Sequence, residues 1–324
     1  MTKIEKDLLS EEDKKLTNEQ TYDLALASMV TKLDGYIVPL INEAFGEKFT
    51  DRAKVVLRNN KHVIQHTDGS LARRDSDAVI ELSEQMVQKL YLIECEAWYD
   101  KTIVMRIAEY DSSVAVETAR VTEEGVILTH PNSAVVFLHP NGEIPKKMKI
   151  THRAPNGEEM SYFVPTMKIG DYSVEDIFQK KLLILLPFYL FRFAKELPEM
   201  EEREDKRKEL EKALIDINQR LESLKAESAI SEYQKRMTQE LLLRVSDRLV
   251  VGYETIRKEV DEIMSGALAR TKADEILEQG QNETKALFGY LLQQGRNEDV
   301  QRAVIDEEFF KELLLEFRKV QISA

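Results

Sequence analysis

The sequence has little cysteine, proline or glycine. Its 324 residues include a single cysteine, Cys95, which excludes an intramolecular disulfide and a zinc site built from cysteines. Only 8 prolines and 12 glycines are present, so few positions force a turn or end a helix. The hydrophobic fraction of 43% is that of an ordered, globular chain, and the length has room for two domains.

Long hydrophobic runs are also missing. The first residues, MTKIEKDLLSEEDKK, are charged and lack the apolar core of a signal peptide. The most apolar run, residues 182–191, is about half the ~20 residues that a helix needs to cross a bilayer. We therefore expect a cytoplasmic protein with no membrane partner.

An excess of positive charge is absent as well. The formal net charge is −13, and acidic residues outnumber basic ones in both the N-terminal and the C-terminal parts of the chain. Contact with nucleic-acid phosphates requires a basic face. Binding of nucleic acid by this chain would therefore need a local basic patch or metal ions.

Hydropathy patterning predicts a mixed α/β region followed by a helical one. Apolar spacing and turn residues set these assignments. Gly35 and Pro39 are expected to bend the first helix, and Pro187 to kink a buried one. The expected elements are a helix over 17–46, a hairpin of strands 77–82 and 91–98, a helix over 101–119, two strands within 125–145, a further strand before residue 170, and a buried helix over 172–197.

After Pro198 the sequence becomes charge-dense. A stripe of apolar residues recurs there at alternating four- and three-residue spacing, which is typical of a coiled-coil seam or a helical hairpin. The stripe consists of Leu210, Leu214, Ile217, Leu221 and Leu224. We expect domains at 1–197 and 198–324, with a looser connection at 265–285 inside the second. The C-terminal helices either pack as a stable domain or form a homo-oligomer.

Two histidines, His62 and His66, have the four-residue spacing of a helical zinc pair. No glutamate follows the first histidine and no third ligand lies nearby, so a polar surface segment explains them better. No glycine-rich phosphate loop, nucleophile elbow or Cys/His dyad is present.

Three carboxylates are a stronger signal. Alternation along the strand at 91–98 places Glu94 and Glu96 on one face. Pairing of the two strands in a hairpin places Asp77 across from these two glutamates. Clustered carboxylate oxygens suit a hard divalent cation, which would also relieve their repulsion. Alternatively, the face is solvent-exposed, or Arg73 and Arg74 neutralise it.

The segments RRDSDAVIEL, YLIECEAWYD and VMRIAEYDSSVAVE resemble the core of the PD-(D/E)XK nuclease superfamily. In particular, they resemble its bacterial branch of recombination-promoting nucleases and transposases. The matching pattern is an R-x-x-D element, a strand of the form Y-x-I-E-C, and a helix with R-x-x-x-Y. Its positions here are Arg74 and Asp77, then Tyr91, Ile93, Glu94 and Cys95, then Arg106 and Tyr110.

The resemblance covers roughly residues 20–195. It implies a restriction-endonuclease-like core, a central mixed sheet flanked by helices, with the helical or coiled-coil C-terminal region following it. It also implies a metal-dependent DNA endonuclease that uses Mg²⁺ or Mn²⁺ to hydrolyse phosphodiesters, associated with mobile elements or recombination.

By the same resemblance, Asp77 and Glu94 bind the metal and are catalytic, and Glu43 is an additional acidic ligand. The residues that would face the active site or the DNA backbone are Arg74, Arg106 and Tyr110.

The sequence departs from the family pattern at Glu96, where the superfamily has lysine and this branch commonly has glutamine. Glu96 could bind a second metal ion, act as a base in catalysis, or mark an inactive site. Lys89 or Lys101 could replace the missing lysine. The alternative functions are therefore a catalytically inactive nuclease fold acting as an oligomeric interaction module, and an RNA-cleaving toxin on the same fold.

Overall fold

The computed structural model describes residues 22, 25–33, 35–58, 61–65, 71–75, 78–139 and 143–323. The chain divides into two compact units, Met1–Gly266 and Ala267–Ala324. Each unit has hydrophobic core residues of its own.

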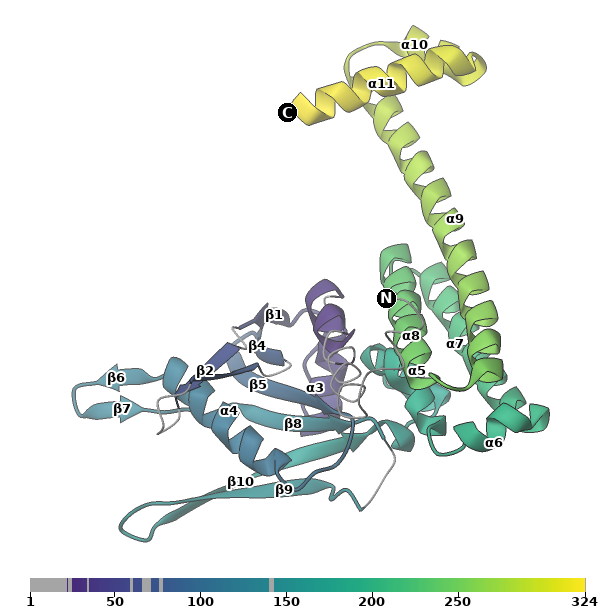
Figure 1. The fold of residues 1–324 in the computed structure, drawn as a ribbon. Helices are drawn as coiled ribbons and strands as arrows, with labels where there is room; N and C mark the ends of the chain where they lie inside the picture. Colours follow the sequence, from purple (N-terminus) through teal and green to yellow (C-terminus); the bar gives the residue numbers. More distant parts are fainter. Residues whose placement is uncertain are drawn as a thin grey trace. The chain divides into compact units, whose positions relative to one another are not determined.

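A six-stranded mixed sheet forms the centre of the first unit (Figure 1). Its strand order is β1-β4-β5-β8-β10-β9, in which the β5–β8 and β8–β10 pairs are parallel and the others antiparallel. This confirms the expected α/β region with a central mixed sheet. The strands are β1 (Lys54–Leu57), β4 (Ala78–Glu84), β5 (Val87–Glu96), β8 (Asn132–Phe137), β9 (Lys147–Arg153) and β10 (Glu159–Lys168), and two separate hairpins comprise β2 (Lys61–Gln65) with β3 (Leu71–Asp75) and β6 (Arg120–Thr122) with β7 (Gly125–Ile127).

The β4–β5 hairpin confirms the expected pairing of the two apolar segments. Its register runs from Ala78 opposite Ile93 to Glu84 opposite Val87. Residues 83–90 lie between the two expected strands, but most of them continue those strands, so that the turn contains only Gln85 and Met86. Gln85 adopts a φ of 55°, the left-handed conformation that a tight turn of this kind requires.

The sheet is covered by a hydrophobic core on each face. Along β5, Tyr91, Ile93 and Cys95 belong to the core that includes α3, whereas Leu92 belongs to the core that includes α4. This division follows from the alternation of side chains along a strand. The helical elements of the first unit that accompany the sheet are α3 (Ile37–Phe45), α4 (Ile103–Glu117), the 3₁₀ turn η1 (Ile169–Asp171), α5 (Val174–Gln179), the 3₁₀ segment η2 (Leu183–Phe193), α6 (Leu197–Glu202), α7 (Glu204–Ala226) and α8 (Glu232–Leu249).

The segment 172–197 is not the single kinked helix that we expected. Helix α5 ends at Gln179, Lys181 has a φ of 56°, and η2 follows as 3₁₀ helix with Pro187 inside it. Proline cannot donate an α-helical hydrogen bond, and its ring clashes with the preceding turn. Nearly every side chain of η2 is buried, so packing on all sides determines its conformation. Gly35, with a φ of 89°, does interrupt the first helical segment, as expected.

The C-terminal region is entirely helical, as predicted. Its apolar stripe on α7 is buried in the first unit's larger core, with Leu214 and Ile217 fully buried. The stripe is therefore covered by the chain itself. Residue 197, where we expected the character of the chain to change, falls inside the first unit at the start of α6.

Helix α9 (Glu254–Gln293) runs without interruption through the region expected to be a looser connection. Glycine costs a helix only about 1 kcal/mol per residue, and the Ala, Glu, Lys and Leu around Gly266 and Gly280 are good helix formers. That expectation was wrong for this reason. In the second unit, the end of α9 packs with α10 (Asn297–Ile305) and α11 (Glu307–Ser323) around Leu287, Leu291 and Leu313. Of the helices in the described ranges, none has both the length and the apolar character needed to cross a membrane.

Candidate active site between β5 and α4

Glu94 is a buried carboxylate near the end of the central strand β5. It lies opposite Val135 of the neighbouring parallel strand β8, and its exposed fraction is 3%. Alternation along β5 directs Glu94 and Glu96 to the face that carries Leu92 and α4. The two adjacent acids of the sequence therefore face a helix rather than open solvent.

Helix α4 places a cation against these carboxylates. Arg106 donates a hydrogen bond to Oε1 of Glu96 and forms an ion pair with it. The exposed fractions of the two side chains are 37% for Arg106 and 17% for Glu96, so the pair is partly shielded from water. Burial lowers the pKa of Arg106, but the nearby carboxylates of Glu96 and Glu94 more than compensate and leave the pKa raised.

Tyr110 lies one turn after Arg106 on the same side of α4. Residues four apart share a helix face. Tyr110 is only 4% exposed and belongs to the α4-side core, together with Ile107 and Val114. The structure thus brings together four of the predicted site residues, namely Glu94, Glu96, Arg106 and Tyr110.

Two further predicted residues, Asp77 and the side chain of Arg74, lie outside the described part of the structure, as does the side chain of Arg73. The last described pair of the β4–β5 register on this side is Ala78 with Ile93. His62 has a described backbone position in β2 but no described side chain, and His66 is outside the described residues.

Glu43 is not brought to this site. It lies on α3, whose buried residues belong to the core on the opposite face of the sheet. Its carboxylate accepts a hydrogen bond from the Tyr172 hydroxyl at 3.2 Å and pairs with Nζ of Lys180 at 2.5 Å. Those partners hold Glu43 at a separate position.

The two lysines considered as replacements are also elsewhere. Lys89 Nζ pairs with Oε1 of Glu47 at 2.6 Å, and Glu47 also accepts a hydrogen bond from the Tyr91 hydroxyl at 3.1 Å. Tyr91 belongs to the α3-side core, which places Lys89, two residues earlier in the strand, on the same side. Lys101 lies exposed in the turn before α4. Among the side chains that the structure describes, Arg106 lies beside Glu94 and Glu96.

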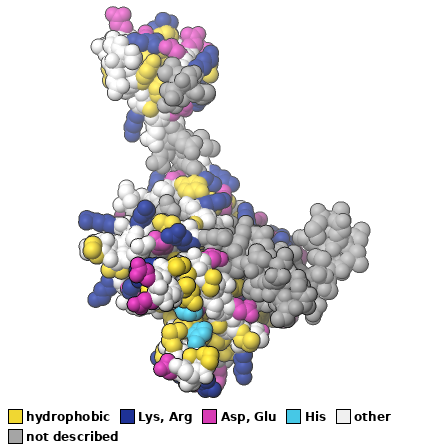
Figure 2. Space-filling view, turned by 90° about the vertical axis from the view of Figure 1, so that its left-hand side faces the viewer, with side chains coloured by type: hydrophobic (Ala, Val, Ile, Leu, Met, Phe, Trp, Pro, Cys, Tyr) yellow, Lys and Arg dark blue, Asp and Glu magenta, His cyan; other side chains and the backbone are white. Residues whose placement is uncertain are grey.

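Sequence reasoning missed a polar cluster around Asp111, which directly follows Tyr110 on α4. Asp111 is fully buried and accepts hydrogen bonds from the hydroxyls of Ser133 and Tyr162, the latter at 2.5 Å. Burial raises the pKa of Asp111 to about 6, although these two hydrogen bonds and the nearby His152 lower it in part. The ring centroid of His152 lies 5.8 Å from that of Tyr162 and 5.2 Å from that of His130. Figure 2 shows histidine side chains at the surface beside hydrophobic ones.

A signal for this cluster was present in the sequence. Asp111 falls between Ile107 and Val114 at the spacing of the buried face of α4, where a carboxylate requires hydrogen-bond donors. Its donors come from β8 and β10, which the local pattern could not identify.

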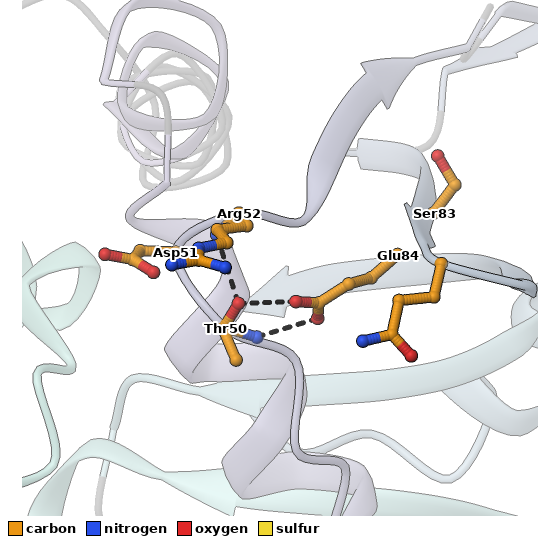
Figure 3. Close-up of a pocket in the computed structure, with 6 residues that line it drawn as sticks. Thr50, Asp51, Arg52, Ser83 and Glu84 are labelled. Atoms are coloured by element: carbon orange, nitrogen blue, oxygen red, sulfur yellow. Dashed lines mark hydrogen bonds between the residues drawn. The ribbon is translucent and has the colours of Figure 1, made fainter.

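A surface hollow of about 500 Å³ lies at the β4–β5 turn (Figure 3). There Glu84 accepts hydrogen bonds from the Thr50 amide at 2.9 Å and from the Thr50 hydroxyl at 2.5 Å. These bonds lower the pKa of Glu84. Of the predicted catalytic residues, the two whose side chains are described, Glu94 and Glu96, do not line this hollow.

Comparison of the chain with protein-family models, curated proteins and solved structures finds no match. Within the described residues, no group of three or more His, Cys, Asp or Glu side chains is arranged to hold a metal ion. The donors present at the β5–α4 site are carboxylate oxygens. Such donors suit Mg²⁺, which commonly takes one or two protein carboxylates and keeps several waters.

Proposed function

We propose that the α/β region is a metal-dependent phosphodiesterase that acts on DNA, with its active site between β5 and α4. The observation that carries the proposal is Glu94, a carboxylate that is 3% exposed on a central strand, with Arg106 and Tyr110 of α4 beside it. These are the residue types, in the order along the chain, that the nuclease resemblance implies.

Burial of the Glu94 carboxylate has an energetic cost. Removing a carboxylate from water is costly unless positive charge or hydrogen-bond donors compensate. Arg106 supplies one positive charge near Glu94 and Glu96. A divalent cation bound by Glu94 would supply more positive charge and would offset the remaining cost of burying this carboxylate.

Asp77 is the second proposed ligand. It directly precedes Ala78, which lies across from Ile93, and Ile93 directly precedes Glu94. Chain connectivity therefore supports Asp77 as the partner of Glu94. When bound, Mg²⁺ or Mn²⁺ would supply Lewis-acid activation of water and of the phosphodiester.

The protein's own residues have separate roles in this proposal. Arg106 stabilises negative charge on the phosphate, as a guanidinium does well because of its planar set of donors. Glu96 orients Arg106 through their ion pair. Tyr110 packs at the base of the site and fixes the face that α4 presents.

Cleavage of supercoiled plasmid with Mg²⁺ or Mn²⁺ tests the proposal. Nicking should require a divalent ion, and both Asp77→Ala and Glu94→Gln should abolish it. Glu84→Gln is the matched control, because it removes a carboxylate from the adjacent strand β4 without touching the site. Calorimetry should detect Mg²⁺ binding that Glu94→Gln weakens. No cleavage with any divalent ion, together with no heat of metal binding, would refute the proposed enzymatic activity.

A second candidate is a catalytically inactive nuclease fold that acts as an interaction module. The observation favouring it is the Glu96–Arg106 ion pair, in which the protein supplies its own cation to the acidic site. On this candidate, plasmid and RNA stay intact with every divalent ion, and light scattering after size-exclusion chromatography detects a homo-oligomer formed through the C-terminal helices. RNA cleavage that depends on Glu94 would instead assign the site to RNA.

A further inference from the structure

One exposed face of the β9–β10 hairpin combines basic and aromatic side chains. Met148 and Ile150 of β9 pack into the α4-side core, so the alternate residues of β9 point to the opposite face. All four of those alternate side chains are exposed. They are Lys147, Lys149, Thr151 and Arg153.

The facing residues of β10 complete this surface. Directly opposed residues of antiparallel strands share a face. Lys149 is opposite Phe163, Thr151 is opposite Ser161, and Arg153 is opposite Glu159. The hydroxyls of Thr151 and Ser161 are hydrogen-bonded at 2.9 Å, which holds the middle of the face in register.

Phe163 is the feature that needs explanation. Its side chain is 52% exposed in the middle of this face, and Nζ of Lys147 lies over its ring at 4.1 Å from the centroid. A cation resting on an exposed ring is held weakly. A planar base could therefore displace Lys147 from the Phe163 ring and stack on it, while Lys147 stays beside the phosphate attached to that base.

The charge of the hairpin differs from that of the chain. Residues 146–163 contain Lys146, Lys147, Lys149 and Arg153 but only two acids, Glu158 and Glu159, whereas the whole chain has a net charge of −13. Glu159 is already paired with Arg153 at 2.6 Å. The stretch around Phe163 is thus a local positive surface in an acidic protein.

We propose that this face, termed the Phe163 face, binds single-stranded nucleic acid. Aromatic side chains that stack on bases within a basic surface are the usual means of binding a single strand. A duplex conceals its base faces in the stack, which favours a single strand as the occupant. The inference rests on the proposed function only in naming the form of its substrate, because binding here needs neither metal nor cleavage.

Lysines on β9 have another possible role, since β9 is an edge strand of the sheet and lysine discourages edge-to-edge pairing. That role explains charge on the edge but not an exposed aromatic ring between the charges. It also makes a different prediction, namely that loss of the lysines promotes aggregation and leaves nucleic-acid binding unchanged.

Fluorescence anisotropy of labelled oligonucleotides with the full chain, at low salt and in EDTA, tests the proposal. Oligo-dT and oligo-U should both bind, whereas a blunt duplex should bind more weakly. Phe163→Ala should weaken binding by about tenfold. Replacing Lys147 and Lys149 with alanine should reduce the slope of log affinity against log salt by about 1.4.

Two controls separate this site from general effects. Met160→Ala removes a similarly exposed apolar side chain, 51% exposed, from the other face of β10. The pair Lys208→Ala and Lys212→Ala removes the same charge from α7. Neither control should change affinity by as much as twofold.

Absence of single-strand binding, or equal effects of Phe163→Ala and Met160→Ala, would overturn the proposal. The binding assay contains EDTA and therefore does not depend on metal-dependent cleavage. Binding that requires Phe163, together with no cleavage in the plasmid assay, would refute the proposed function and leave this proposal standing. Tighter binding of either oligo-dT or oligo-U supports the site and shows which of these two oligonucleotides it prefers.

Discussion

Replacing Arg106 with methionine tests the electrostatics of the β5–α4 site. Methionine retains an unbranched stem that can pack, but it removes the guanidinium that pairs with Glu96. Breaking a buried ion pair costs about 3–5 kcal/mol, whereas an exposed pair contributes about 0–1 kcal/mol. With 17% of Glu96 and 37% of Arg106 exposed, we expect an intermediate loss of ~1.5–3 kcal/mol in unfolding free energy.

Urea unfolding, followed through the single tryptophan, Trp98, measures this loss. Glu96→Gln should rescue the Arg106→Met variant, because it removes the carboxylate left without its guanidinium. In the Arg106→Met variant, the pKa of Glu96 should rise above its value in the unfolded chain. The stability of this variant should then fall as the pH rises through the raised pKa. Arg153→Met is the control, since its pair with Glu159 is 74% and 44% exposed and should contribute little.

A double-mutant cycle gives the decisive quantity. A coupling energy between positions 96 and 106 within ~0.3 kcal/mol of zero would refute the reasoning. If the site binds Mg²⁺, adding the ion at ten times its dissociation constant should stabilise the protein by ~1.4 kcal/mol. Glu94→Gln should remove that stabilisation.

Three further predictions concern buried groups. The ring of His139 stacks on that of Trp98 with centroids 3.7 Å apart, and burial lowers the pKa of His139 to about 4. The free energy of unfolding measured in urea should therefore fall, by at most ~3 kcal/mol, as the pH drops from 6.5 through 4. His139→Phe should flatten this pH dependence. The pKa of Asp111 is raised to about 6, so its ionisation should destabilise the fold as the pH rises from about 4 through 6. The unfolding free energy of Asp111→Asn, measured relative to that of the wild type, should therefore increase by up to ~3 kcal/mol between pH 4 and pH 8. Leu214→Ala should cost ~2–5 kcal/mol of stability without changing the molecular mass in solution, because the α7 stripe is buried in the chain's own core, and a change in mass at full stability would contradict this.

Local patterns were sufficient for the part of the site that lies on single elements. Alternation along β5 placed Glu94 and Glu96 on one face, which is a consequence of strand geometry that adjacent residues determine. Arg106 and Tyr110 were assigned to the site by the nuclease resemblance, and their shared side of α4 follows from their four-residue spacing. The β4–β5 hairpin followed from two apolar runs separated by polar residues.

The features that sequence reasoning missed depend on contacts far apart in the chain. Asp111 is satisfied by Ser133 and Tyr162, which are 22 and 51 residues away and on different strands. The 3₁₀ conformation of η2 depends on burial from all sides and on Pro187, which periodicity alone does not resolve. Glu43 has the residue type of a metal ligand, but its helix packs against the other face of the sheet.

The Glu96–Arg106 pair changes how the departure from the nuclease pattern is understood. If the site binds phosphate as proposed, a glutamate in the place of lysine would bring unfavourable negative charge to it. Arg106 pairs with that charge, so the combination of Glu96 and Arg106 is close to neutral. A glutamine at position 96 could still accept a hydrogen bond from Arg106 and would leave its positive charge available to the substrate. If the site is a nuclease, Glu96→Gln should therefore increase the nicking rate at fixed Mg²⁺ concentration. A loss of nicking as complete as that caused by Glu94→Gln would instead make Glu96 a ligand or base.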